Sequence, residues 1–228
     1  MKDITEYAYD QIGLDNTLNE SPYQKRLRPT IVNWACYSKN KKCLEQVQQR
    51  VHNYLYANES LPENMRASML CNTMRIANDD IFTKLKQRTF LMELNVNERM
   101  DIIGALTCRM NELHLDKLLT ESLMVSGNDI NYISMEERYN VFKTLVKNGA
   151  MGVDVAIEFL LKHLEEAAKI YGNTNINNAL TSTAMYVNGE ILQKKVTFTY
   201  TRIYSVHISI LNVVKLFWTS REKIFFTF

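Results

Sequence analysis

Hydrophobic side chains recur every three or four positions along most of the chain, with polar side chains between them. This spacing places the hydrophobic side chains of each segment on one face of an α-helix. The pattern therefore predicts a succession of amphipathic helices. Its clearest series are Leu27, Ile31, Trp34 and Ala35; Leu44, Val47, Val51, Tyr54 and Leu55; Met65, Met69, Thr73 and Ile76; Leu115, Leu118, Leu119 and Leu123; Tyr139, Phe142 and Val146; and Val153, Ile157, Leu160, Leu161, Leu164, Ala168 and Tyr171.

Residues typical of helix starts stand at several boundaries of these series. Ser21 followed by Pro22 is typical of an N-cap followed by the first helical residue. The sequence of Ser60–Glu63, Ser-Leu-Pro-Glu, predicts a second start of the same kind. Ser134 with Glu137 three positions later matches a capping box. The boundaries thus agree with the helices that the hydrophobic spacing predicts.

Residues that interrupt helices are rare, since the chain of 228 residues has only 7 glycines and 3 prolines. Average composition would give about 25 or more of them together. So few breakers leave little room for hairpins, which favours an almost entirely helical chain. Gly149 predicts the end of one helix and the start of the next. Pro29 falls inside a predicted helix, and we expect it to shift the first turn of that helix to about Leu27 or Arg28.

The number of helices bears on the fold. The series and boundaries predict about nine or ten helices of roughly 10 to 18 residues, joined by short polar connections that make neighbours antiparallel. We therefore predict an all-α fold, an α-solenoid of stacked antiparallel helix pairs of the HEAT or armadillo type. A closed helical bundle is the alternative, and it is less favoured because ten helices exceed what one four-helix core accommodates.

The last segment of the chain has a different pattern. From Ile191 onward, β-branched residues and alternation of polar and apolar positions replace the helical spacing, without any glycine or proline. We therefore predict a helical-repeat domain at residues 1–190 and a C-terminal tail at residues 191–228 that does not match it. The pattern does not define the structure of that tail.

Charge and motifs exclude several classes of function. With 27 basic and 25 acidic residues the net charge is only +2, so nucleic acid is not an expected partner. No uninterrupted apolar stretch approaches about 18 residues, and the first residues do not form a signal peptide. The sequence contains no GxxxxGK[ST], GxGxxG, GxSxG or HExxH motif. We therefore predict no transmembrane segment, no catalytic residue and no metal ligand in this chain.

Two histidines have carboxylates close to them in the sequence. His114 lies between Glu112 and Asp116, and His163 precedes Glu165 and Glu166. On helices such groups are usually solvated surface pairs. A metal site needs three or four ligands, which neither group supplies. We therefore assign neither histidine a role.

The four cysteines are Cys36, Cys43, Cys71 and Cys108, and no CxxC motif occurs, which argues against a zinc ribbon or a thioredoxin-type site. Cys36 ends one hydrophobic series and Cys43 opens the next, so the two are close enough to bridge. Cys71 and Cys108 lie about two elements apart, which fits neighbours in a stacked array. Four buried free thiols are the alternative, and spacing alone leaves the choice open.

Two sequence triplets are candidate N-glycosylation sites. Asn19-Glu20-Ser21 and Asn58-Glu59-Ser60 both match the acceptor pattern, although Pro22 gives the first a poor context. Together with the four cysteines, they favour an oxidising compartment.

A family resemblance rests on several motifs in order. Residues 27–36, LRPTIVNWAC, with Cys43 seven positions later, resemble the C-terminal domain of the aminopeptidase N family of zinc metallopeptidases, with insect midgut aminopeptidases the nearest. The similarity covers about residues 1–190. It departs after Cys71, where the family has a glycine and then a tryptophan and this chain has Ala77 and Ile81 or Phe82. Its further motifs are MLCNTMR at 69–75, DIIGALTC at 101–108, AIEF at 156–159 and IYG at 170–172.

The resemblance implies a HEAT-like stack of short helices that forms a bowl over a catalytic domain. It also implies two disulfides, Cys36–Cys43 and Cys71–Cys108. In the family, the zinc site, the catalytic glutamates and the GAMEN motif belong to an upstream domain. Residues 149–152 of this chain look like the start of GAMEN but are not followed by its glutamate, and we interpret them as a helix boundary. We therefore expect no cofactor in this chain and zinc in the intact family enzyme.

The resemblance makes this chain the C-terminal domain or a fragment of a zinc aminopeptidase, which removes N-terminal amino acids from peptides. We expect it to be inactive alone. A truncated gene model is a third interpretation, which the sequence leaves open, since Met1 lies inside the family domain and the motifs stop near residue 190. Its expected partners are an aminopeptidase catalytic domain or a peptide substrate, with a homodimer as a further candidate. The resemblance implies an extracellular or cell-surface location. The alternative is a stand-alone helical-repeat module that binds a protein or peptide.

Overall fold

The structure is a computed structural model that describes residues 2–17, 20–89, 94–123 and 135–186. Those residues form ten α-helices and one short 3₁₀ helix, with no strand among them, which confirms the all-α prediction. The tail predicted at 191–228 and the capping serine predicted at 134 lie outside the described residues. The elements are α1 (Lys2–Ile12), α2 (Pro22–Tyr37), α3 (Lys41–Tyr56), α4 (Glu63–Met74), α5 (Asp79–Arg88), α6 (Val96–Leu106), α7 (Glu112–Leu123), α8 (Met135–Leu145), η1 (Val146–Asn148), α9 (Ala150–Tyr171) and α10 (Asn173–Tyr186).

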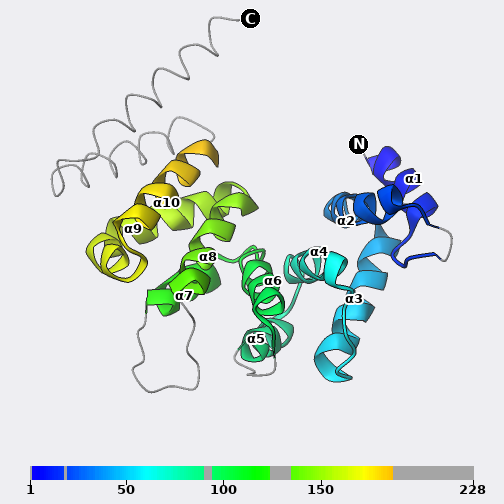
Figure 1. The fold of residues 1–228 in the computed structure, drawn as a ribbon, viewed down its shortest axis with the longest axis horizontal. Helices are drawn as coiled ribbons and strands as arrows, with labels where there is room; N and C mark the ends of the chain where they lie inside the picture. Colours follow the sequence, from blue (N-terminus) through cyan, green and yellow to red (C-terminus); the bar gives the residue numbers. More distant parts are fainter. Residues whose placement is uncertain (1, 18–19, 90–93, 124–134, 187–228) are drawn as a thin grey trace, which may run out of the picture.

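The helices stack side by side in two layers (Figure 1). Helices α2, α4, α6 and α8 form one row, in which each helix packs against the next. Helices α3, α5 and α7 lie along one side of this row, against α4, α6 and α8 respectively. Helix α1 packs on α2 at one end, while α9 and α10 pack together at the other. Each helix thus contacts its neighbours in the array, as in the predicted helical repeat and unlike a closed bundle.

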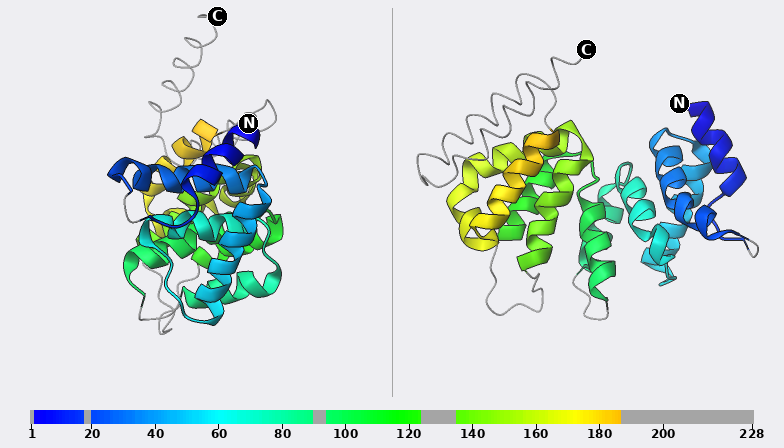
Figure 2. Two further views of the ribbon diagram at one scale, coloured as in Figure 1. Left: turned by 90° about the vertical axis from the view of Figure 1, so that its right-hand side faces the viewer. Right: turned by 45° about the horizontal axis from the view of Figure 1, so that its top comes forward.

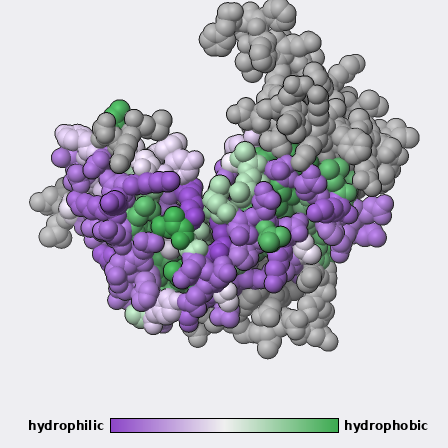
Figure 3. Space-filling view, turned by 180° about the vertical axis from the view of Figure 1, so that it is seen from behind, coloured by the Kyte–Doolittle hydropathy of each residue, from purple (hydrophilic) through white to green (hydrophobic). Residues whose placement is uncertain are grey.

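The row of helices is curved into an open arc. In Figures 1 and 2, α1 and α2 at one end and α9 and α10 at the other rise on the same side of the molecule. The space-filling view in Figure 3 shows the surface hollowed between these two ends. A curved array of this kind presents an extended concave surface, which a compact bundle does not.

The predicted buried faces hold for most helices. Val47, Val51 and Tyr54 of α3 are at most 1% exposed, and Leu115 and Leu119 of α7 are as deeply buried as the pattern predicts. These side chains belong to one hydrophobic core that runs between the two layers. Burial of apolar side chains on this scale, at about 2 kcal/mol each, holds neighbouring helices together.

The predicted face of α2 is wrong by one position. Its buried residues are Arg28, Val32, Ala35 and Cys36, whereas Trp34 of the predicted series is 48% exposed. The cause is the guanidinium of Arg28, whose Nη1 donates to the side chains of Asn16 and Glu20. These partners let the whole arginine side chain enter the core, and the helix turns accordingly.

Two predicted helix starts have different outcomes. Ser21 caps α2 as predicted: Gln24 N–H donates to Ser21 Oγ at 3.2 Å, and Ser21 N–H donates to the Gln24 side chain at 3.0 Å. At the second start, α4 begins at Glu63 with Pro62 as its N-cap and without a side-chain cap, so the prediction of a cap at Ser60 is wrong. Pro62 has a fixed φ and is itself the N-cap residue. Ser60 stands two residues before this N-cap, so its side chain does not cap the helix.

Pro29 does not shift the start of α2. The helix runs from Pro22 to Tyr37 with Pro29 inside it. The capping box at Ser21 fixes the first turn. The carbonyl that lacks the Pro29 N–H belongs to Lys25, an exposed residue, so the missing hydrogen bond lies on the solvent side of the helix.

Gly149 marks a helix boundary, as predicted. It separates η1 from α9 and has φ of +100°, a conformation that L side chains rarely adopt. Helix α9 then continues for 22 residues, longer than the predicted range, because it passes through a kink at His163 (φ −122°, ψ 22°). The resemblance of residues 149–152 to GAMEN is therefore a helix start, as we interpreted it.

Candidate functional site

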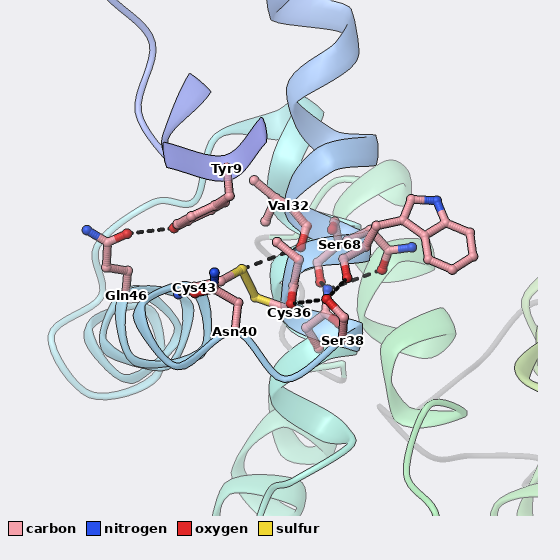
Figure 4. The surroundings of a disulfide bond; sticks show 12 residues. Tyr9, Val32, Cys36, Ser38, Asn40, Cys43, Gln46 and Ser68 are labelled. Carbon is pink, nitrogen blue, oxygen red and sulfur yellow. Dashed lines mark hydrogen bonds between the residues drawn. A yellow bond between two sulfur atoms is a disulfide. The ribbon is translucent and has the colours of Figure 1, made fainter. Parts of the chain in front are cut away.

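Two disulfides join the ends of helices in the described part of the chain. Cys36 in the last turn of α2 bonds to Cys43 in the first turn of α3, with Cα atoms 5.3 Å apart (Figure 4). The intervening turn is short, and Asn40 caps α3 by accepting from the Cys43 N–H at 3.0 Å. The bond therefore closes a helical hairpin whose ends are already held by a cap.

The second disulfide links two neighbouring helices of the row. Cys71 lies in α4, and Cys108 is the second residue after the end of α6, again with Cα atoms 5.3 Å apart. No described cysteine is free. The pairs are those that the family resemblance implies, and they leave no thiol among them for catalysis or for metal binding.

A series of arginines near the starts of the row helices was not predicted. Arg28 in α2, Arg66 in α4 and Arg138 in α8 are buried, and Arg99 in α6 is half-buried. An arginine inside or beside a hydrophobic series, such as Leu27-Arg28 or Met65-Arg66, is the signal that could have identified them. Arginine side chains are seldom buried, so the hydrophobic spacing does not include these positions.

Two of these arginines connect successive helices of the row. Arg66 Nε of α4 donates to Asp101 of α6 at 2.8 Å, and Arg99 of α6 lies 3.5 Å from Glu137 of α8. Burial raises the pKa of the Asp101 carboxyl, and the Arg66 hydrogen bond opposes that shift. Because an unpaired buried charge is costly, these pairs fix the register of one helix against the next.

Polar contacts also hold the first three helices and the connection between α1 and α2 together. Hydrogen bonds from Arg28 hold the pKa of the Glu20 carboxyl below its usual range. The Tyr9 hydroxyl of α1 donates to the Gln46 side chain of α3 at 2.6 Å (Figure 4), and burial raises the pKa of Tyr9 to about 12. The hydroxyl is thus protonated and donating at neutral pH, which ties α1 to α3.

His114 contacts neither of the carboxylates that flank it in the sequence. Its Nδ1 accepts from Arg109 Nε at 2.9 Å, and its ring stacks on Phe82 with centroids 5.1 Å apart. Arg109 also donates to the carbonyls of Ala77 and Asn78 at 3.1 and 3.0 Å. It thereby supplies a hydrogen-bond donor to two carbonyl groups of the connection after α4. His114, Arg109 and Phe82 thus pack together where α5 and α7 meet, close to the segment in which the family resemblance departs.

His163 forms the surface pair that we predicted. Its Nδ1 lies 3.4 Å from Glu166, one turn along α9, and the two side chains are 32% and 59% exposed. Among the residues that the structure describes, no group of three or more His, Cys, Asp or Glu could hold a metal ion. None of the described helices is both long and apolar enough to span a membrane.

The two predicted glycosylation sites differ in what the structure says of them. Asn58 is exposed in the turn after α3 and has φ of +55°. Its side-chain oxygen accepts from Nη1 and Nη2 of Arg88, both at 3.3 Å. Asn19 lies outside the described residues.

Comparison with known proteins gives one family. The family model described as the ERAP1-like C-terminal domain matches residues 1–198, which is most of the chain. No curated protein matches the sequence significantly. The match ends at residue 198, past the boundary that we predict at residue 190, and both positions lie outside the described residues.

Proposed function

Because the chain belongs to the family of ERAP1-like C-terminal domains, and so is an aminopeptidase-family domain, we propose that it covers a zinc-containing catalytic domain and does not hydrolyse peptides alone. The observation that carries this proposal is the family match over residues 1–198, in agreement with the motifs of the aminopeptidase N family. The curved two-layer array supports it, since an open arc can enclose one side of a partner domain.

The arc would act by limiting access to the catalytic site. A wall of helices over a zinc site excludes bulk water and restricts the orientations in which a peptide reaches the metal. Such a wall must keep its curvature to be effective. The Cys71–Cys108 disulfide and the Arg66–Asp101 pair both join α4 to α6 near the middle of the row, and they would resist flattening there.

The test is to measure the chain alone and together with a family catalytic domain from which its own C-terminal domain has been removed. We expect the chain alone to leave an alanyl-anilide substrate intact, and to co-elute with the catalytic domain in size-exclusion chromatography. Hydrolysis by the chain alone that a chelator abolishes would contradict the proposal. So would separate elution of the two domains at micromolar concentrations.

We also propose that the chain folds in an oxidising, extracytoplasmic compartment and carries an N-glycan on Asn58. The support is two disulfides together with an exposed acceptor asparagine in a turn. On secretory expression, endoglycosidase treatment is expected to increase gel mobility. Asn58→Gln and Ser60→Ala should each abolish that change, whereas Asn19→Gln, the control, should retain it. A change that persists in Asn58→Gln would place the glycan elsewhere.

Peptide substrate and a second copy of the chain are further partners that we propose on the same basis. The hollowed side of the arc offers a surface for a peptide. Light scattering of the purified chain tests the homodimer, since a dimer doubles the measured mass of 26.6 kDa.

A further inference from the structure

A cation that has no acidic partner among the described residues lies where the ends of α2 and α4 meet. Arg75 is the C-cap residue of α4, and its guanidinium carbon lies 4.9 Å from the ring centre of Tyr37, the last residue of α2. No carboxylate of the described residues forms an ion pair with Arg75. Burial lowers the pKa of this guanidinium, so the group is partly desolvated. A charge in such a position is stabilised when an anion binds to it.

A buried asparagine holds this guanidinium in place. Asn72 is only 2% exposed, and its Oδ1 accepts from Arg75 Nη1 at 2.5 Å. The Asn72 amide nitrogen donates to the Ser68 carbonyl at 2.9 Å and to Asn33 Oδ1 of α2 at 3.2 Å. Because the asparagine is fixed from both helices, the arginine that it contacts is preorganised and loses little side-chain entropy when a ligand binds.

Apolar surface lies directly beside the cation. The rings of Trp34 and Tyr37 contact each other edge to face with centroids 5.9 Å apart, yet they remain 48% and 58% exposed. Ile76, which follows Arg75, is 50% exposed. Exposed aromatic rings next to a fixed arginine are typical of recognition surfaces.

The chemistry of these groups indicates the ligand. A guanidinium presents two parallel N–H groups that match a carboxylate. Phosphate chains and nucleic acids are bound by several cations together, and the whole chain has a net charge of only +2. The neighbouring rings suit an aliphatic or aromatic side chain. The complementary ligand is therefore a single carboxylate with an apolar group next to it.

We propose that Arg75, Tyr37 and Trp34 form a binding site for an acidic side chain of a linear peptide segment that has an apolar residue beside the acid. The carboxylate accepts from the free N–H groups of Arg75, and the apolar residue packs on the rings of Tyr37 and Trp34. The site goes beyond the proposed function, because its residues lie in α2 and at the C-cap of α4 and it needs no catalytic domain.

The fluorescence of Trp34 provides a direct test. The sequence has one other tryptophan, Trp218, which is replaced by phenylalanine in every protein used. The probe is the peptide Gly-Leu-Glu-Leu-Gly, acetylated and amidated so that the glutamate is its only charge. Its control has glutamine instead of glutamate. We expect a saturable fluorescence change with the acidic peptide and binding of the glutamine peptide that is weaker by about tenfold, or ~1.4 kcal/mol.

Matched arginine variants assign the effect to one residue. Arg75→Gln should reduce the affinity for the acidic peptide to that of the glutamine peptide, and Arg75→Lys should reduce it in part because a lysine lacks the planar fork. Arg26→Gln changes an exposed arginine near the start of α2 and should leave the affinity unchanged. Circular dichroism checks that each variant is folded. The comparison of the glutamate and glutamine peptides tests the site even if an arginine variant does not fold, because it uses the chain that retains Arg75.

Three results would overturn this site. The first is equal affinity of the folded, unaltered chain for the glutamate and glutamine peptides. The second is no fluorescence change with the acidic peptide up to about 10 mM, the range of very weak binding. The third is an equal loss of affinity in Arg75→Gln and Arg26→Gln, which would indicate attraction by the overall charge of the protein.

Discussion

Replacing Cys71 and Cys108 together by alanine is expected to lower the free energy of unfolding by about 4 kcal/mol, and replacing Cys36 and Cys43 by about 2.4 kcal/mol. The reason for the difference is the loop that each bond closes, 37 positions for the first and 7 for the second. A bond that closes a longer loop removes more conformational entropy from the unfolded chain. Both double variants lose the same two side chains, so the comparison isolates loop length.

Urea unfolding followed by circular dichroism measures both losses of free energy. The slope of the free energy of unfolding against urea concentration must be fitted for each variant. Equal losses, or a larger loss from the Cys36–Cys43 pair, would contradict the assignment of these pairs. Alkylation of the unfolded, unreduced chain gives an independent control. We expect no alkylated cysteine without reductant and four with it, whereas four in both cases would mean that neither bond forms.

The helices and their stacking could be predicted because each depends on short-range periodicity. Val47, Val51 and Tyr54 are three or four positions apart, and this spacing alone places them on one side of α3. The scarcity of glycine and proline also favours helices over hairpins without reference to any tertiary contact. A succession of short amphipathic helices with polar connections then favours a repeat, since none of them can bury its hydrophobic face alone.

The face of α2 could not be predicted because it depends on a partner outside the helix. Periodicity places an arginine on the solvent side, whereas Arg28 is fully buried. Its partners Asn16 and Glu20 belong to the connection before α2, which has no pattern to show that it folds back. The rotation of a helix about its axis is thus decided by polar contacts that the hydrophobic pattern does not contain.

The same limit applies to the Arg75 site and to His114. Asn33 and Asn72 are 39 positions apart, and their hydrogen bond exists only because α2 packs on α4. His114 is flanked by carboxylates in the sequence but contacts Arg109 and Phe82, which reach it from the chain before α7 and from α5. Sequence neighbours are a poor guide to the partners of a polar side chain when the helix is short and its ends are covered by loops.

Gly152→Ala is expected to destabilise the domain by about 3 kcal/mol, a large effect for the addition of one methyl group. Gly152 lies in the first turn of α9, where the chain passes close to the end of α8. A Cβ atom at this position would be 2.1 Å from the carbonyl oxygen of Leu145 and 3.1 Å from its carbonyl carbon. Because the obstacle is backbone, no side-chain rotation relieves it, and α9 must move away from α8.

Gly104→Ala is the matched control for this prediction. Gly104 also lies within a helix, α6, but a Cβ there would meet only the Thr144 methyl group at 3.7 Å, an ordinary contact. Since alanine favours a helix over glycine by about 1 kcal/mol, this variant should be as stable as the unaltered chain or more so. Urea midpoints of the two variants measure the contrast, and equal midpoints would mean that α9 does not start as close to Leu145 as described.

The contrast between these two glycines also decides how residues 149–152 are interpreted. If a substrate required the Gly-Ala-Met-Gly sequence, as its likeness to GAMEN suggests, a methyl group on Gly152 would affect binding and leave stability unchanged. Since the space beside Gly152 is filled by the backbone of Leu145, we expect the opposite, a loss of stability in the chain without any ligand. The glycine is then required because α9 approaches α8 closely. This contact joins α9 to the row formed by α2, α4, α6 and α8.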